Sequence, residues 1–226
     1  MAQTEQVTIR ELFSLEETLA GEYLSQFTYP WEALAGIHDL ILALGPKLPK
    51  DRYDQVAEDV WIAKSAKVFD SAYIGGACII GEETQVRQCA FIRGDALVGD
   101  HSVVGNSAEL KNVIIFNHCE VPHYNYVGDS ILGFHAHMGA GAITSNIKAD
   151  RKNIVIRGAQ EVYETGRRKM GAAIGDWVEV GCNTVLNPGT VIGKRAMIYP
   201  TSCVRGIVPS DTIVKNTGEM IAKRED

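Results

Sequence analysis

Residues 62–110 read IAKSAKVFDSAYIGGACIIGEETQVRQCAFIRGDALVGDHSVVGNSAEL, and every sixth residue of this stretch is aliphatic. A helix repeats near 3.6 residues and an ordinary strand near 2, so a period of six fits neither. The period is typical of a hexapeptide solenoid, in which short parallel strands stack coil on coil. The aliphatic positions are Ile62, Val68, Ile74, Ile80, Val86, Ile92, Val98, Val104 and Leu110.

A small residue stands four places after each aliphatic residue, and the large Ile114 is the exception. We expect both positions to point into the solenoid and the residue after the aliphatic one to point outward. The period resumes at Leu132 and Met138, and again from Ile174 to Val204. The small positions are Ala66, Ala72, Cys78, Thr84, Ala90, Ala96, Ser102 and Ala108.

The repeat divides the chain into an N-terminal helical cap at residues 1–55, a β-solenoid domain at 56–210 and a polar C-terminal tail at 211–226. Within the solenoid the pattern breaks at residues 144–173. There NIVIR and EVYETG, on either side of Gly158, favour a hairpin that ends in the basic run Arg167-Arg168-Lys169. A long insertion without the repeat is usually functional or disordered.

The N-terminal segment carries helix signals. Ser14 and Glu17 form a candidate capping box, and Pro30 is expected to begin a helix that ends before Gly45-Pro46. We expect its apolar stripe to cover the N-terminal end of the solenoid, where core and strand edges would otherwise be exposed. A helix that binds a partner is the alternative. The stripe comprises Trp31, Leu34, Ile37, Leu40, Ile41 and Leu44.

Composition excludes several functions. With 22 basic and 28 acidic side chains the net charge is −6, which argues against nucleic acid as a partner. The sequence has no run of eighteen apolar residues and begins MAQTEQVTIRELF, without a basic region followed by an apolar one, so we expect a cytoplasmic protein. The five cysteines are scattered and include no C-x-x-C pair.

The outward position of most hexads is small or neutral, but Arg87, Arg93 and Lys111 occupy it in three of them. Shortly after them comes His123-Tyr124-Asn125-Tyr126-Val127-Gly128-Asp129, followed by Gly139-Ala140-Gly141 and Asn146. This stretch resembles the H-x-x-Y-[LIV]-G-D…G-A-G-x-x-x-x-N signature of the glucosamine-1-phosphate acetyltransferase domain. Residues 165–193, TGRRKMGAAIGDWVEVGCNTVLNPGTVIG, are similar to the archaeal sugar-1-phosphate nucleotidylyltransferases that carry an acetyltransferase tail. The resemblance covers about residues 60–210.

The resemblance implies a single-stranded left-handed parallel β-helix that forms homotrimers, with sites between subunits. It implies acetyl transfer from acetyl-CoA, without a metal, to the amine of a hexosamine 1-phosphate. His123 would be the general base, since a protonated amine must lose a proton before it attacks a thioester. Tyr126 and Asn146 would hold the sugar. The phosphate would be bound by Arg93, Lys111 and Lys152, and acetyl-CoA by the weaker candidates Ala140, Cys182 and Lys215.

Charge and hydrogen bonding extend these expectations. Three cations around one dianion favour phosphate over neutral sugars, and the run Arg167-Arg168-Lys169 is expected to help hold CoA or the sugar phosphate. The backbone N–H groups of residues 139–141 are candidates for stabilising the tetrahedral oxyanion. Because Val178, Val180 and their neighbours bring little charge to the outward faces, we expect a trimer that buries one flank of each prism.

The chain departs from the family pattern at three points. Its first sixty residues offer no Gly-rich loop after a strand, so we expect no nucleotidylyltransferase domain in this sequence. His137 stands two residues before Gly139, where the acetyltransferases usually carry Asn. Ile147 and Lys148 replace the bacterial Tyr and Asp after Asn146. These departures concern the identity of the substrate more than the reaction class.

Two other functions remain open on the sequence. His118 and His123, with His135 or His137, also resemble the γ-class carbonic anhydrases, in which three histidines from two subunits hold zinc. The remaining histidine of that family, however, has no counterpart near Glu82. The second alternative is a non-catalytic trimeric scaffold or regulatory solenoid related to sugar-nucleotide pyrophosphorylases, since a fold alone does not establish a function.

Overall fold

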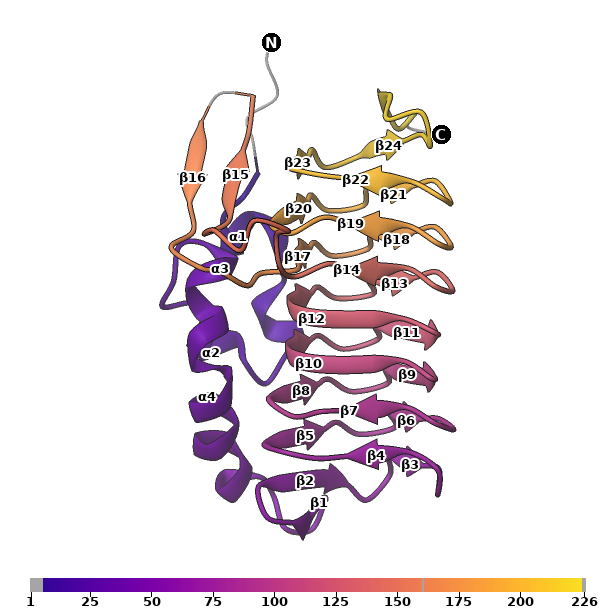
Figure 1. The fold of residues 1–226 in the computed structure, drawn as a ribbon. Helices are drawn as coiled ribbons and strands as arrows, with labels where there is room; N and C mark the ends of the chain where they lie inside the picture. Colours follow the sequence, from indigo (N-terminus) through magenta and orange to yellow (C-terminus); the bar gives the residue numbers. More distant parts are fainter. Residues whose placement is uncertain (1–5, 160, 225–226) are drawn as a thin grey trace.

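The computed structural model describes residues 6–159 and 161–224. Short parallel strands stack into a prism, and helices run along one side of it (Figure 1). The predicted single-stranded left-handed parallel β-helix is therefore confirmed. None of the helices in the described ranges is both long enough and apolar enough to cross a membrane.

Each coil passes over three faces in turn. The first face comprises β2 (Val60–Ala63), β5 (Cys78–Ile80), β8 (Ala96–Val98), the second halves of β10 (Glu109–Ile115) and β12 (Tyr126–Leu132), β17 (Ala172–Ile174), β20 (Thr190–Ile192) and β23 (Ile207–Val208). The third face comprises β4 (Tyr73–Ile74), β7 (Phe91–Ile92), the first halves of β10 and β12, β14 (Ile143–Thr144), β19 (Val185–Leu186) and β22 (Cys203–Val204).

The second face is a separate sheet that extends into the expected tail. Its strands are β3 (Lys67–Val68), β6 (Gln85–Val86), β9 (Val103–Asn106), β11 (Glu120–His123), β13 (His137–Met138), β18 (Glu179–Val180), β21 (Met197–Ile198), β24 (Thr212–Val214) and β25 (Met220–Ala222). Because β24 pairs with β21 and then antiparallel with β25, residues 212–214 and 220–222 form strands where a polar tail was expected.

The hexad positions fill the interior of the prism. Ile80 and Leu110 are fully buried, as are the aliphatic residues between them. At the N-terminal end Val68 is 37% exposed, because no coil stacks beneath β3. Ile114 is not an inward residue: Val113 pairs with Ala96 and takes the small position, so Ile114 faces outward.

The helical segment lies along the first face and does not cover the end of the solenoid, which corrects the expectation from the sequence. Its elements are α1 (Ile9–Leu12), η1 (Leu15–Glu17), α2 (Gly21–Leu24), α3 (Pro30–Ala33), η2 (Leu34–Gly36), α4 (Ile37–Leu44) and η3 (Gly45–Lys47). Helix α4 packs on β8 and β10 (Figure 1). The reason is that the outward residues of this face, Ile79, Leu97 and Ile114, are apolar and need cover. The end coil is covered by β1 (Tyr53–Ala57), which pairs antiparallel with β2.

The expected capping box at Ser14 and Glu17 is wrong. Ser14 makes no cap hydrogen bond, and its hydroxyl donates to Asp176 at 2.8 Å. A capping box of this segment is instead formed by Thr8 with Glu11. Pro30 does begin a helix, as expected, and the apolar stripe that follows it is largely buried.

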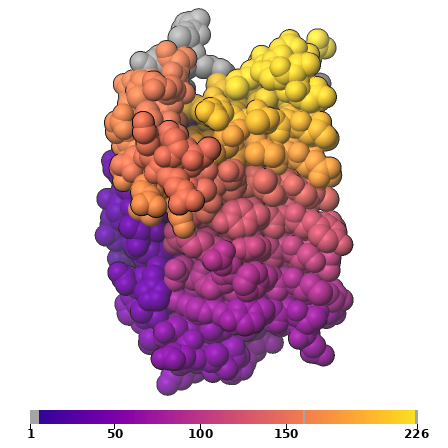
Figure 2. Space-filling model, in the orientation of Figure 1, coloured from indigo at the N-terminus to yellow at the C-terminus, as the bar shows by residue number. Residues whose placement is uncertain are grey.

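The insertion forms the predicted hairpin. Strands β15 (Val155–Arg157) and β16 (Val162–Glu164) pair antiparallel. The ring of Tyr163 lies 5.5 Å from that of Tyr29 and 5.8 Å from that of Trp31, between ring centroids. The insertion therefore packs against the helical segment, as the space-filling view shows (Figure 2).

Candidate functional site

Tyr126, Asn146 and Asp129 form one hydrogen-bonded group at the edge of the third face. Nδ2 of Asn146 donates to the hydroxyl of Tyr126 at 3.0 Å and also donates to Oδ2 of Asp129. The tyrosine hydroxyl lies over Gly128, where an added Cβ would come within 2.4 Å of it. Glycine at this position leaves the space that the hydroxyl needs to reach Asn146.

Asp129 is the buried centre of this group. It is only 2% exposed, and its Oδ1 accepts hydrogen bonds from Lys111 Nζ at 3.0 Å and from Asn112 Nδ2 at 2.9 Å. A buried carboxylate must be paired and hydrogen-bonded, and here the donors come from the preceding coil and from the insertion. The sequence reasoning gave Asp129 no role. An acidic residue between apolar stretches was the signal that donors lie nearby.

The charges around Tyr126 keep it protonated. Burial raises the pKa of Tyr126, and the carboxylates of Asp129 and Glu109 raise it further. Arg93 is engaged on this face, because its Nη1 donates to Oε1 of Glu109 at 2.9 Å, a bond that raises the pKa of Arg93. Tyr126 can therefore act as a hydrogen-bond donor over the usual pH range.

His123 lies at the other edge of the third face, at the end of β11, and is exposed. The N–H of Gly141 donates to the carbonyl of His123 at 2.9 Å, and the N–H of Asn183 donates to that of Ala140 at 2.8 Å. His123, Ala140 and Cys182 thus hold equivalent positions in three successive coils. At the usual strand spacing they form a row about 10 Å long.

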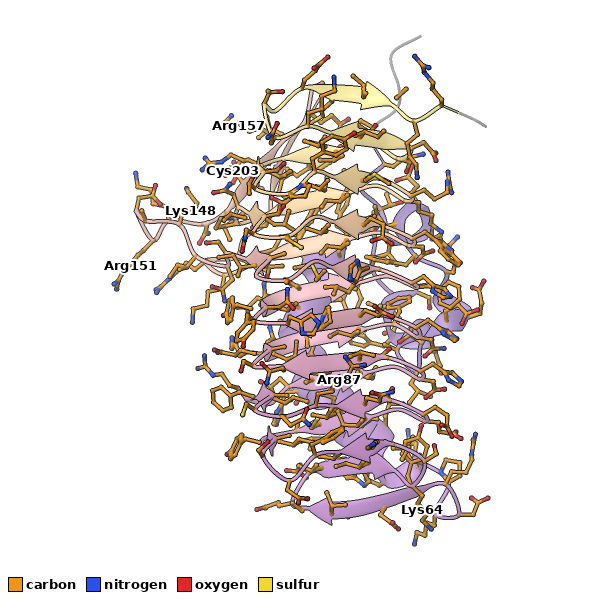
Figure 3. All side chains as sticks on the ribbon, turned by 90° about the vertical axis from the view of Figure 1, so that its right-hand side faces the viewer. Lys64, Arg87, Lys148, Arg151, Arg157 and Cys203 are labelled. Atoms are coloured by element: carbon orange, nitrogen blue, oxygen red, sulfur yellow. The ribbon has the colours of Figure 1, made fainter. Side chains whose placement is uncertain are left out.

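Two other expected site residues lie apart from these groups. Nζ of Lys215, just after β24, pairs with Glu219 at 3.0 Å. Lys152 lies exposed in a loop of the insertion, next to Lys148 and Arg151, which project away from the coils (Figure 3). Arg93 and Lys111 each pair with a carboxylate of the same chain, Glu109 and Asp129, and the convergence of these two cations with Lys152 on one phosphate stays a prediction.

The basic run at residues 167–169 lies across from Lys111 instead. A pocket of about 520 Å³ opens between the coil corner, the helical segment at residues 34–35 and the end of the insertion. Cations outnumber carboxylates in it, and no ion pair involves Arg168 or Lys169 within residues 6–159 and 161–224. Its charged lining residues are Lys111, Arg167, Arg168, Lys169, Asp95 and Asp129.

The turn at residues 139–141 offers fewer free N–H groups than expected. Gly139 donates its N–H to the carbonyl of Val180 at 2.6 Å, and Gly141 donates to that of His123. Of these three amides, that of Ala140 alone has no backbone acceptor among the described residues. The candidate oxyanion donor is thereby narrowed to Ala140.

The histidines proposed as zinc ligands do not converge in this chain. His118 and His135 stack in a column with His101 and Trp177, at centroid distances of 4.8, 4.7 and 3.9 Å along it. Stacked imidazoles direct their lone pairs in parallel, so they cannot both reach one ion about 2.0–2.1 Å away. Burial lowers the pKa of His135, and the neighbouring His118 adds to this effect.

His137 lies elsewhere, on the second face. Its Nδ1 is 2.8 Å from Oε2 of Glu179, and Nε2 is 4.0 Å from Glu120. Across the described ranges, no group of three His, Cys, Asp or Glu side chains is arranged to hold a metal. The carbonic-anhydrase alternative therefore gains no support from the geometry of one chain.

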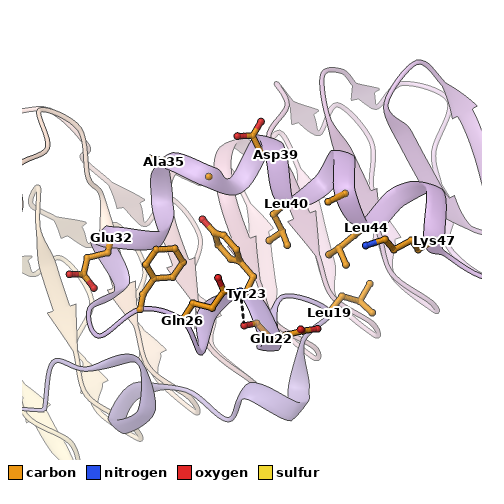
Figure 4. A pocket seen from close by; sticks show the side chains of 13 residues that line it. Leu19, Glu22, Tyr23, Gln26, Glu32, Ala35, Asp39, Leu40, Leu44 and Lys47 are labelled. Atoms are coloured by element: carbon orange, nitrogen blue, oxygen red, sulfur yellow. Dashed lines mark hydrogen bonds between the residues drawn. The ribbon is translucent and has the colours of Figure 1, made fainter.

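A second cavity, of about 550 Å³, lies within the helical segment between α2 and α4 (Figure 4). Its wall includes the apolar side chains of Leu19, Leu40 and Leu44 together with Tyr23. None of the motif residues lines it, so it is separate from the candidate site.

The chain is similar to several known proteins. A family model described as the GMPPB C-terminal domain matches residues 74–163. The bifunctional protein GlmU of Methanococcus aeolicus is 32% identical over 175 residues, which are 70% of this chain and 42% of the relative. A bifunctional sugar-1-phosphate nucleotidylyltransferase/acetyltransferase of Sulfurisphaera tokodaii is 32% identical over 145 residues, 64% of this chain and 36% of the relative. Among solved structures, a hexapeptide transferase family protein from Anaplasma phagocytophilum is similar at a TM-score of 0.42 and 15% identity, over 74% of this chain and 81% of that one.

Fold and repeat together define a hexapeptide-repeat protein with a left-handed β-helix. The motif around His123 and the curated relatives place it more narrowly: the solenoid is a GlmU acetyltransferase-like domain, which confirms the resemblance read from the sequence. The chain spans about a quarter to a half of the length of the curated relatives that it matches.

Proposed function

We propose that this protein is an N-acetyltransferase that moves an acetyl group from acetyl-CoA to the amine of a hexosamine 1-phosphate. One observation carries the proposal: the group formed by Tyr126, Asn146, Asp129 and Lys111 lies on the same solenoid face whose edge carries the exposed His123. A hydroxyl, an amide and a cation beside an imidazole suit a polar, anionic acceptor with a basic amine. The curated relatives named for sugar 1-phosphates and acetyl transfer support the same class of substrate.

In the proposed reaction, His123 removes a proton from the acceptor ammonium. The freed lone pair attacks the thioester carbonyl, a C–N bond forms, and the C–S bond breaks. CoA leaves as a thiolate and takes up the second proton, which the nitrogen loses as the neutral amide forms. The N–H of Ala140, one coil along from His123, stabilises the tetrahedral oxyanion. The step uses no metal.

Acetyl-CoA is placed along the row of His123, Ala140 and Cys182. Gly139 and Gly181, just before Ala140 and Cys182, bring no side chain to this strip. The next coil lies so close that an added Cβ would come within 2.6 Å of the nitrogen of Cys182 at Gly139, and within 2.4 Å of that of Pro200 at Gly181. An extended acyl chain fits against such a strip. Lys215 at the far end and the pocket of residues 167–169 are the candidates for the phosphates.

A homotrimer, in the cytoplasm, is part of this proposal. In one chain the ring of His123 has no hydrogen-bond partner among the described residues, so a neighbouring subunit would complete the site. The expected basis for the trimer is wrong, because Val178 and Val180 are 0% and 1% exposed and point into the coil. The exposed apolar residues of the third face are Tyr73 and Phe91, whose rings lie 5.4 Å apart.

The test is release of thiol from acetyl-CoA in the presence of glucosamine 1-phosphate, galactosamine 1-phosphate, glucosamine 6-phosphate or free glucosamine. The proposal expects thiol release with a hexosamine 1-phosphate and little with the free sugar. Zinc content is measured on the same preparation. A rate of thiol release that is the same with and without every acceptor would reject the acetyltransferase function. Activity that disappears when bound zinc is lost would favour the carbonic-anhydrase alternative.

The second candidate is a non-catalytic scaffold, favoured by the match of residues 74–163 to a domain described only as the GMPPB C-terminal domain. It predicts a stable oligomer that releases no thiol with any of the acceptors. The same preparation distinguishes the two candidates, because light scattering and the thiol assay give independent readings.

A further inference from the structure

We propose that Asp129 is a positioning residue that fixes which atoms of Tyr126 and Asn146 face the acceptor; this role rests on the proposed acetyltransferase function. An ionised carboxylate can only accept hydrogen bonds. The nitrogen of the Asn146 amide, and not its oxygen, must therefore face Asp129. The opposite rotamer would set the amide oxygen against a carboxylate oxygen and lose both donated bonds.

The orientation of Asn146 in turn determines the role of Tyr126. The second N–H of the amide points to the hydroxyl of Tyr126, whose oxygen accepts it at 3.0 Å. The proton of that hydroxyl must then point away from Asn146. With both N–H groups used, Oδ1 is the only free polar atom of the Asn146 amide. The face thus presents one donor, from Tyr126, next to one acceptor, from Asn146.

This pair of groups specifies the chemistry of the ligand. The acceptor substrate must bring a hydrogen-bond acceptor, such as a phosphate or sugar oxygen, to Tyr126. It must bring a donor, such as a hydroxyl or an ammonium, to Asn146. Among the described residues, Lys111 donates one hydrogen bond, to Asp129. Its ammonium group has three N–H groups, so it can also contact an anion. A hexosamine phosphate has both kinds of group, whereas a ligand with acceptors alone would leave Asn146 unsatisfied.

The same face contains an internal control. Tyr73 lies in the same column of β-strands, and its hydroxyl lies over Gly75, where an added Cβ would come within 2.7 Å of it. No side-chain hydrogen bond of Tyr73 occurs in the described ranges. Tyr73 and Gly75 therefore repeat the geometry of Tyr126 and Gly128 without the amide and the carboxylate.

The first test uses the free protein and does not depend on catalysis. In a ¹⁵N–¹H spectrum assigned with Asn146→Ser, the side-chain amide of Asn146 should show a downfield proton from its bond to the carboxylate. Asp129→Asn should abolish that downfield shift, and Tyr73→Phe should leave it in place. An amide resonance that does not change in Asp129→Asn would overturn the proposed orientation, whatever the reaction catalysed.

The second test is kinetic. Asp129→Asn should raise KM for the hexosamine phosphate about tenfold or more, a loss of one well-aligned pair of hydrogen bonds, while KM for acetyl-CoA stays unchanged. Gly128→Ala should have a similar effect, because its Cβ displaces the Tyr126 hydroxyl without touching Asp129. Tyr73→Phe is the control, because it removes a hydroxyl that makes no side-chain hydrogen bond in the described ranges and keeps the ring, and it should leave both constants unchanged. Gly128→Ala keeps the test decisive if Asp129→Asn does not fold.

The double variant Asp129→Asn/Asn146→Asp separates positioning from stability. It keeps one amide, one carboxylate and the net charge, but Tyr126 must now donate its proton to the carboxylate at position 146 and has none for the ligand. We expect the double variant to fold, with a midpoint in urea close to wild type, and to bind the hexosamine phosphate as poorly as Asp129→Asn. Recovery of the wild-type KM in the double variant would overturn the proposal. If wild-type protein acetylates no hexosamine phosphate, the proposed function fails while the spectroscopic test of Asp129 still stands.

Discussion

Ser14 donates two hydrogen bonds to Asp176, one from its backbone N–H at 2.9 Å and one from its hydroxyl at 2.8 Å. The carboxylate is 1% exposed and also receives Lys194 Nζ at 2.8 Å and the N–H of Phe134 at 2.9 Å. The two residues are 162 positions apart in the chain. Asp176 therefore ties the helical segment to a corner of the coils.

Loss of this contact should be costly for stability. Asp176→Ala leaves Lys194 and several N–H groups without their acceptor, and should lower the free energy of unfolding in urea by about 3–5 kcal/mol. Ser14→Ala removes one hydroxyl bond and should cost about 0.5–1.5 kcal/mol. The control is Asp211→Asn, which breaks the exposed pair with Arg195 but suits the positive φ of this position, and it should cost less than about 1 kcal/mol. Equal effects of Asp176→Ala and Asp211→Asn would contradict the role of this contact.

The pair of His38 and Asp95 should make stability depend on pH. Nδ1 of His38 lies 2.7 Å from Oδ1 of Asp95, a hydrogen bond that raises the pKa of His38. The pair therefore stabilises the fold fully below the unfolded pKa of about 6.5, and this contribution is lost as the pH rises through the folded value. The Tm difference between wild type and His38→Gln should be small but positive at pH 5.5, since both groups are partly exposed. It should vanish at pH 9, and a constant difference would assign the effect to packing.

His123 should carry the chemical step. His123→Ala should lower kcat by about 10²–10⁴, the usual share of general-base catalysis, while the affinity for acetyl-CoA and the oligomeric state persist. Thiol release, equilibrium binding of acetyl-CoA and light scattering measure these three properties. The matched control is His137→Gln on the second face, which should keep the wild-type kcat. Full activity of His123→Ala would assign the proton transfer to another group.

The basic run should bind the phosphate of one substrate. Arg168→Gln with Lys169→Gln should raise KM for either the hexosamine phosphate or CoA and should flatten its salt dependence. Comparing CoA with dephospho-CoA tells whether the 3′-phosphate is the group that is bound. Arg151→Gln is the control, because this side chain of the same insertion projects away from the coils (Figure 3). Unchanged constants at every salt concentration would leave the run as a solvated loop.

The third face should contain the contact between subunits. Tyr73 and Phe91 are 59% and 42% exposed and lie side by side, and burial of such rings favours association. Phe91→Glu should shift the protein towards monomer in light scattering at micromolar concentration. A substitution at Trp177, which is 51% exposed on another corner, should not. A trimer unaffected by Phe91→Glu would exclude this part of the face from the interface.

The repeat predicted the interior of the coils well, because an inward position sees the same neighbours in every coil. The repeat placed Ile114 wrongly. In β10 it is Val113 that pairs with the inward Ala96, so the small inward position comes one residue earlier than the period of six predicts. The uninterrupted apolar strand at residues 78–80, CII, was the signal that both sides of the first face are buried and that helices would lie along it.

The site was predictable only in part, for a related reason. The motif names Tyr126, Asp129 and Asn146 but not which of them touch, because their contacts join different coils and the insertion. Likewise, the capping pattern of Ser14 and Glu17 is sound locally, yet a buried carboxylate 162 residues away takes the serine hydroxyl. Local patterns could not show either partnership.

The coils on the two sides of the insertion stack directly on each other, with Ile131 paired to Ala173 and Leu132 to Ile174. Because each coil of a solenoid takes its register from its neighbours alone, residues 145–171 form a cassette whose length and content can change while the prism is inherited intact. Asn146 at the start of this segment donates a hydrogen bond to Asp129, and the basic run at residues 167–169 lies at its other end. Exchange of this one loop would therefore change which anion the protein binds, while the edge of the prism that carries His123 stays the same.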